Sequence, residues 1–106
     1  MLFCPASRLP NQRFNVTLGG QDVTIALRWR ITGLFVDLAW QNGEQIVNGV
    51  IAQDRNRIVR SAYLGFSGDL IFADTQGTSD PDWLGIGDRF FLVYLTPDEV
   101  AAFDVG

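Results

Sequence analysis

The residue types that most often carry enzymatic chemistry are scarce in this chain of 106 residues. It contains no histidine and a single cysteine, Cys4. Ser-His-Asp and Cys-His arrangements are therefore impossible, and so are zinc sites built from histidine and several thiolates. Because no base is identifiable for Cys4, we interpret it as an inert thiol. We predict no catalytic residue and expect that the protein is not an enzyme.

Carboxylates could still hold a metal ion. Four aspartates lie close together in the sequence: Asp74, Asp80, Asp82 and Asp88. Oxygen-rich loops bind calcium, but this spacing departs from the twelve-residue calcium loop, and Pro81 interrupts it. We interpret these aspartates as solvated turn residues that cap backbone N–H groups. The sequence therefore predicts no metal site and no cofactor.

Two weaker signals concern small ligands. Asp37 and Glu44 could form the carboxylate pair of a glycosidase, but few polar donors surround them to orient a sugar. Trp29, Trp40 and Trp83 could line a groove, yet two of them fall on the apolar register of strands. Core packing is therefore the favoured interpretation of the tryptophans.

The elements that must position these groups are β-strands. Apolar and polar residues alternate over residues 12–18, 22–31 and 34–40, as in half-buried strands. The second of these is the clearest, with one apolar face formed by Val23, Ile25, Leu27, Trp29 and Ile31. Glycine pairs break the pattern, and we expect Asn42-Gly43 to supply two positive φ angles for a tight hairpin.

The second half of the chain is less regular. A fourth strand is expected over residues 45–52, where Gly49 marks a bulge or a sharp bend. Residues 53–61 are expected to form an exposed connection, with Ile58 and Val59 tucked beneath it. Residues 70–73 form a short strand, and residues 89–96 form a final strand that is apolar on both faces and hence central. Thr96 is expected to cap a short helical turn that begins at Pro97.

This pattern predicts an all-β protein: a small antiparallel β-barrel or sandwich of about six strands, with a short C-terminal helical turn. We expect one β domain over residues 1–106, of which residues 1–10 form an N-terminal arm. One cysteine suits a reducing cytoplasm, and no apolar run approaches the length of a membrane span.

Charge narrows the choice of partners. The formal net charge is −4, so nucleic acid is not expected as the primary ligand. All eight cations are arginines, whose planar groups form forked pairs and stack in protein interfaces. The alternative explanation of this bias is the base composition of the source genome. Arg28 and Arg30 lie on the polar face of their strand, and we predict that they form a protein interface together with Arg55, Arg57 and Arg60. The alternative for these residues is ordinary surface charge.

The order of the motifs resembles the phage baseplate plug family of contractile-tailed bacteriophages. The resemblance rests on the opening strand at Gln12 to Leu18, the second strand with its arginine and aromatic end, the Leu-Phe-Val-Asp-Leu strand from Leu34, the Asn-Gly hairpin, and the closing segment from Leu84 to Leu95. It covers nearly the whole chain. The loop from Gln53 to Tyr63 is richer in arginine than the family pattern.

The resemblance implies a structural virion protein of the tail baseplate, made in the host cytoplasm. Such a protein would plug the distal end of the tail tube by packing against hub and tube proteins. We expect a homo-oligomer in the assembled particle and no membrane contact. The alternative from another class is a β-barrel module that binds a small ligand or carbohydrate, in which the tryptophans face a cavity.

Overall fold

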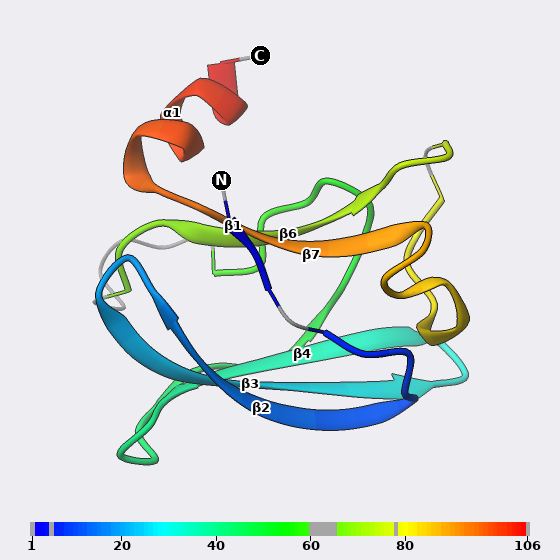
Figure 1. Cartoon of the computed structure of the whole chain (residues 1–106), viewed down its shortest axis with the longest axis horizontal. Helices are drawn as coiled ribbons and strands as arrows, with labels where there is room; N and C mark the ends of the chain where they lie inside the picture. The colour runs from blue at the N-terminus through cyan, green and yellow to red at the C-terminus, as the bar shows by residue number, and fades with distance from the viewer. Residues whose placement is uncertain (1, 5, 60–65, 78, 106) are drawn as a thin grey trace.

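Two antiparallel sheets face each other in the computed structural model, which describes residues 2–4, 6–59, 66–77 and 79–105, with side chains up to residue 102 (Figure 1). The four-stranded sheet has the order β2-β3-β4-β5, and the three-stranded sheet has the order β1-β7-β6. The expected sandwich is confirmed. The strands of the described ranges do not close into a barrel, so the barrel alternative is wrong.

The strands largely follow the expected ranges. They are β1 (Leu2–Phe3), β2 (Asn11–Leu18), β3 (Gln21–Arg30), β4 (Gly33–Trp40), β5 (Gln45–Ile51), β6 (Asp69–Asp74) and β7 (Phe90–Leu95). A 3₁₀ helix, η2 (Trp83–Gly85), precedes β7, and the helix α1 (Pro97–Val105) follows it. Within the described part of the chain, no helix has the length and apolar character needed to cross a membrane.

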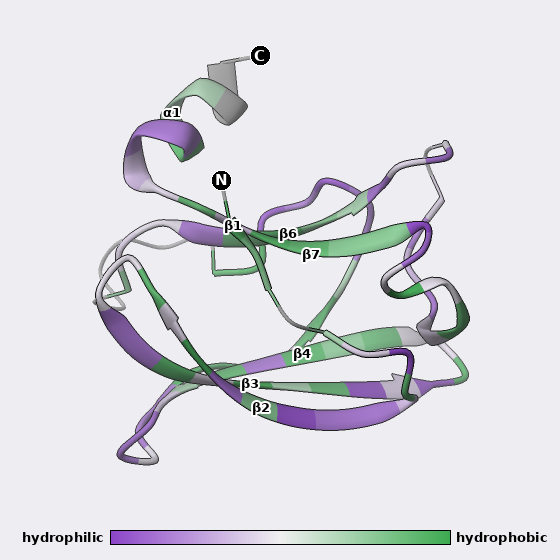
Figure 2. Cartoon of the chain, viewed as in Figure 1, coloured by the Kyte–Doolittle hydropathy of each residue, from purple (hydrophilic) through white to green (hydrophobic). Residues whose placement is uncertain are grey.

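The main core lies between the sheets and comes from the inward face of each strand. Alternation places Val23, Ile25 and Leu27 of β3 there without exposure to solvent. Figure 2 shows the same contrast of hydrophobic and hydrophilic residues along β2 and β3, while β7 is hydrophobic along most of its length. All three tryptophans pack against this core, as predicted.

The closing strand β7 is central and is covered on both faces. Phe90, Leu92 and Tyr94 belong to the main core, whereas Val93 and Leu95 belong to a second, smaller cluster on the outer face. The side chain of Val100 in α1 packs on this outer cluster. The cap is as expected: Glu99 N donates to Thr96 Oγ1 at 3.3 Å, and Thr96 N donates to Glu99 Oε1 at 3.0 Å.

Two turns explain how the four-stranded sheet is connected. Gly19 and Gly20 have φ angles of 58° and 78°, which suit a two-residue hairpin. A side chain at Gly19 would collide with the Tyr94 hydroxyl, which donates to Ser67 O at 2.6 Å. At Asn42-Gly43 only the glycine has a positive φ, of 99°, so the expected pair of positive angles is wrong. The Asn42 side chain instead accepts a hydrogen bond from Glu44 N at 2.9 Å.

Three further expectations concern Ile31, Gly49, and the pair Ile58 and Val59. Ile31 is fully exposed because β3 ends at Arg30 and the turn begins there, so its placement on the apolar face is wrong. Gly49 does mark a bulge: its φ is 69°, and the register between β4 and β5 shifts beside it. Ile58 and Val59 are buried as expected.

Truncating the two faces of β7 should have unequal effects. Leu92 is almost wholly buried in the main core, so Leu92→Ala should lower the free energy of unfolding by about 2 to 5 kcal/mol. Phe91 is half-buried and stacks on Phe3 with ring centroids 5.4 Å apart, so Phe91→Ala should cost only about 1 to 2 kcal/mol. Urea denaturation measures both values. Equal losses would contradict this description of the outer face.

Candidate protein interface

Three of the five arginines predicted for an interface are held by contacts within the chain. Arg28 Nη2 lies 2.9 Å from Asp37 Oδ1, and the same oxygen accepts the N–H of Gly49 at 2.6 Å. Arg28 therefore joins β3, β4 and the bulge of β5. Its side chain still has one exposed face, but its charge is already matched.

The arginines that follow β5 fasten their segment to β6. Arg55 Nη1 lies 2.8 Å from Asp54 Oδ2, and Arg55 Nη2 donates to Asp74 O at 3.1 Å. Arg57 Nε lies 2.9 Å from Asp69 Oδ2. These contacts hold the segment against the sheet. Arg60, the fifth predicted interface residue, lies outside the described residues.

Arg30 differs from the other described candidates. Its Nη1 donates to the carbonyl oxygen of Trp29 at 2.9 Å, and it forms no ion pair within the described ranges. The same is true of Arg8 and Arg13, which the sequence did not single out. Among the described arginines, these three are therefore the ones whose charge is free for a partner.

Sequence reasoning missed two buried carboxylates, one at each end of β6. The Asp69 side chain has no exposure to solvent, and its Oδ1 accepts the N–H groups of Ile58, Val59 and Leu70. The Asp74 side chain is also fully buried. The available signal was the aspartate on either side of the apolar run at residues 70–73.

Asp74 organises the loop that was expected to be solvated. Its two oxygens accept from Arg89 Nε and Nη2, each at 2.8 Å, and from the N–H groups of Gln76 and Ser79. The hydrogen bonds from Arg89, followed by those from the backbone, hold the pKa of Asp74 well below its usual range. The expectation that it is a solvated turn residue is therefore wrong.

Two of the other loop aspartates, Asp80 and Asp82, do cap backbone groups. Asp82 accepts from the N–H groups of Leu84 and Gly85 at the start of η2, and Asp80 accepts from Asp54 N at 3.0 Å. In the described part of the chain, no group of three or more acidic or cysteine side chains is arranged to hold a metal ion. Burial raises the pKa of the Cys4 thiol to about 12, which keeps it protonated at neutral pH.

One end of the sandwich gathers exposed apolar side chains, and we call it the loop end. It consists of residues 7–10, the turn between β3 and β4, and η2, which lie at the right of Figure 1, together with the end of β5, where the Ile51 side chain lies beside Gly33. The exposed large apolar residues there are Leu9, Ile31, Ile51 and Leu84. Ile31 is wholly exposed and Leu84 is 62% exposed. Isolated folded proteins rarely expose several large apolar side chains close together, whereas protein–protein interfaces commonly contain them.

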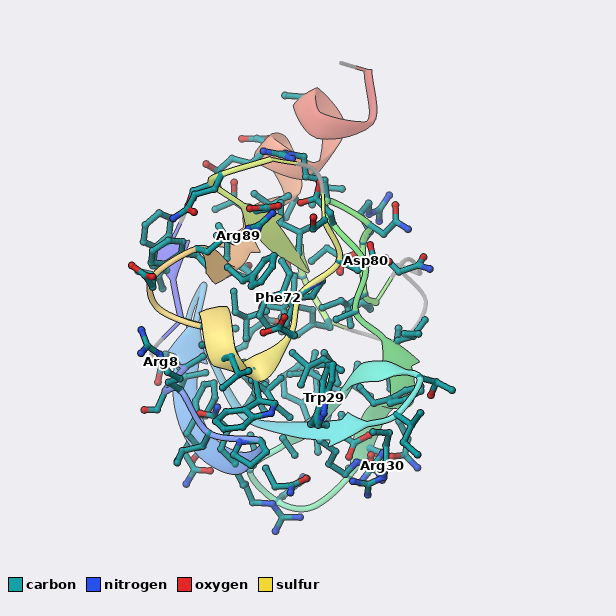
Figure 3. All side chains as sticks on the ribbon, turned by 90° about the vertical axis from the view of Figure 1, so that its right-hand side faces the viewer. Arg8, Trp29, Arg30, Phe72, Asp80 and Arg89 are labelled. Carbon is teal, nitrogen blue, oxygen red and sulfur yellow. The ribbon has the colours of Figure 1, made fainter. Side chains whose placement is uncertain are left out.

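Two of the unpaired arginines border this apolar group. Figure 3 looks onto the loop end and shows Arg8 and Arg30 pointing outward on opposite sides, while Trp29 lies between the two sheets. Residues 7–9 are held in place by Gln12, whose side chain bonds both Ser7 N, at 2.9 Å, and Ser7 O, at 2.6 Å. The loop end thus combines apolar side chains with unmatched positive charge.

Two grooves lie on the outer faces of the sheets. An almost wholly apolar one of about 270 Å³ crosses the three-stranded sheet, between Phe3, Phe91 and Ile71. A polar one of about 280 Å³ lies on the four-stranded sheet, over Ala26 and Ala39 and beside Arg13 and Asp37. Trp40 reaches the polar groove, but its indole ring also packs against Phe66 in the core.

Replacing Arg28 or Arg30 by alanine should affect the stability of the fold differently, because Arg28 is ion-paired and Arg30 has no ion pair with a described residue. Arg28→Ala frees Asp37 and the bulge, and should lower the free energy of unfolding by about 1 kcal/mol. Arg30→Ala breaks no ion pair with a described residue and should change the free energy of unfolding by less than about 0.5 kcal/mol. Urea melts of both variants provide the comparison. A larger loss for Arg30→Ala would contradict the assignment.

The Asp74–Arg89 pair should be visible in the pH dependence of stability. Because the folded pKa of Asp74 is lowered, its carboxylate stabilises the fold above the ordinary aspartate pKa, about 4, and this contribution is lost as the pH falls below that value. Asp74→Asn should be less stable at pH 7 and should show a flatter dependence between about pH 5 and pH 2. Thermal melts across this range test it, with the exposed Asp88→Asn as the control.

Comparison with known proteins supports the resemblance found in the sequence. Residues 1–98 match the family model described as cyanophage baseplate Pam3 plug gp18. No curated protein matches the chain. The match spans every strand of both sheets and η2, and it ends within α1. The chain belongs to this family of phage baseplate plug proteins, whose name places it in the virion tail.

Proposed function

We propose that this protein closes the distal end of the tail tube of a contractile-tailed phage until the tail contracts. The loop end packs against hub and tube proteins, and several copies assemble in each particle. The mechanism is occlusion and release, and no covalent chemistry takes part. The protein is made in the host cytoplasm and joins the tail there.

The proposal rests on the side chains that are exposed at the loop end. Ile31 and Leu84 project apolar side chains into solvent, and Arg30 has no internal counter-charge among the described residues. Apolar anchors surrounded by polar and charged groups are typical of the centre and rim of protein interfaces. The family supplies the setting, a baseplate, in which such a surface meets other tail proteins.

The shape of the core also suits a plug. A single cluster of buried residues fills the space between the two sheets. The Cα atoms span 33 × 31 × 21 Å. A filled body of this kind blocks a passage without moving parts, because packed interiors resist compression.

The polar groove on the four-stranded sheet favours the alternative function, small-ligand or carbohydrate binding. It offers Arg13, Asn15, Thr24 and Gln45 as hydrogen-bonding groups. Two of these already bond each other, since Thr24 Oγ1 donates to Asn15 Oδ1 at 2.7 Å. A saturable change in tryptophan fluorescence on adding free sugars would favour this alternative over the plug.

Electron cryomicroscopy of tails that carry the chain tests the plug proposal. We expect density for this fold across the distal end of the tube. The double variant Arg30→Ala with Ile31→Ser should be incorporated about tenfold less, because it removes one apolar anchor and one charge. Leu2→Ser, which removes an exposed apolar side chain elsewhere, should be incorporated normally. Density away from the tube end would overturn the proposal.

A further inference from the structure

Three of the four sheet edges are protected against pairing with another strand. The edge of β6 is covered by the preceding segment, since Ile58 N donates to Leu70 O at 3.0 Å and Arg55 N to Phe72 O at 2.8 Å. The edge of β5 is interrupted by the bulge at Gly49. The edge strand β1 has only two residues. Short strands, bulges and covering segments are the usual protections of sheet edges.

The fourth edge, β2, is long and regular. It spans eight residues, contains no proline, and pairs with β3 without a register shift from Asn11 to Leu18. It lies at the outside of the four-stranded sheet, in the lower front of Figure 1. Its only charged side chain is that of Arg13.

The direction of the backbone groups of β2 follows from one hydrogen bond. Trp29 N donates to Pro10 O at 2.8 Å, which continues the register that pairs Asn11 with Arg28. Since backbone groups alternate in direction along an antiparallel pair, the even-numbered residues of β2 face β3. Asn11, Arg13, Asn15 and Thr17 therefore point their N–H and C=O groups away from the sheet. No described residue outside the strand bonds them.

The inner face of β2 is also incompletely covered. Phe14 and Val16 pack on the main core, but both remain half-buried. Their cross-strand partners on β3, Ile25 and Val23, are completely buried. A strand added beside β2 would cover the exposed parts of Phe14 and Val16 while it satisfies the free backbone groups.

We propose that β2 accepts an extended segment of another tail protein, which becomes the fifth strand of the sheet. The segment carries apolar residues beside Phe14 and Val16 and an acidic residue beside Arg13, which has no ion pair within the described ranges. Strand addition of this kind gains affinity from the backbone and specificity from alternate side chains. The inference rests on the proposed place of the chain in a tail.

A second copy of this chain fits the edge less well than a different protein. β2 runs away from the loop end, because residues 7–10 enter it there and the Gly19-Gly20 turn lies at the opposite end (Figure 1). Antiparallel pairing of two β2 strands would therefore direct the two loop ends in opposite directions. Both could not then dock on the same tube end.

A proline substitution tests the edge without disturbing the sheet. Asn15→Pro removes one outward N–H, and proline is tolerated on the free side of an edge strand. Asn15→Ala retains the N–H and is the matched control. We expect incorporation into tails to fall at least tenfold for Asn15→Pro and less than twofold for Asn15→Ala. Circular dichroism and thermal melting of the purified variants establish that both are folded.

Two direct measurements complete the test. Cryomicroscopy should show a strand about 4.8 Å from β2, and the amides of Arg13, Asn15 and Thr17 should exchange hydrogen at least tenfold more slowly in tails than in the free protein. Arg13→Glu should lower incorporation several-fold.

Three results would contradict the addition of a strand to β2. If the chain lies at the tube end but these amides exchange as in the free protein, the strand addition is wrong while the plug proposal stands. Equal incorporation of the Asn15→Pro and Asn15→Ala variants would also overturn it. So would a dimer of the purified protein that Asn15→Pro dissociates, because the occupant of the edge would then be a second copy.

Discussion

The fold depends on a buried carboxylate at each end of β6. β6 is covered on both sides, so the residues that flank it also lie in the interior. Their backbone N–H groups cannot hydrogen-bond to water there and need acceptors within the protein. Asp69 accepts three of these groups at the entry, and Asp74 accepts two at the exit. Among the described residues, Arg57 pairs with Asp69 and Arg89 with Asp74, which limits the cost of burying the two charges.

These two carboxylates hold the chain on either side of β6, and the second of them also fixes the loop that leads to η2 at the loop end. Asp69 and Arg57 hold the segment that leads into β6, while Asp74 and Arg89 hold the loop that leads to η2 and β7. Leu84 thus lies between the two ends of the loop held by the Asp74–Arg89 ion pair, and Asp82 accepts its backbone N–H. A surface that is already rigid in the free protein binds a partner more tightly, because less conformational entropy is lost on binding.

Much of the fold could be predicted because its signals are local. The alternation of apolar and polar residues predicted β2, β3 and β4. The two apolar faces of β7 predicted its central place in a sheet, and Thr96 predicted the start of α1. Ile31 was misplaced because alternation does not show where a strand stops. The choice between barrel and sandwich depends on how β5 and β6 are connected in space, which no local pattern reports.

The candidate interface was harder to predict, because the role of an arginine depends on its distant partners. Arg57 meets Asp69 and Arg89 meets Asp74 across 12 and 15 positions of the chain. The composition does not distinguish among the eight arginines. The structure shows that some of the described arginines form ion pairs within the fold, whereas others are exposed and have no ion pair with a described residue.

That division has a physical consequence for assembly. Arg28, Arg55 and Arg57 have already found their counter-charges, so engaging a partner would require a native ion pair to be broken or shared. Arg8 and Arg30 at the loop end, and Arg13 on the edge strand, require no such exchange. Because β2 leads away from the loop end, the two surfaces face different directions (Figure 1). A single small sandwich can therefore contact two tail components at once, which is what a plug held in place from more than one side requires.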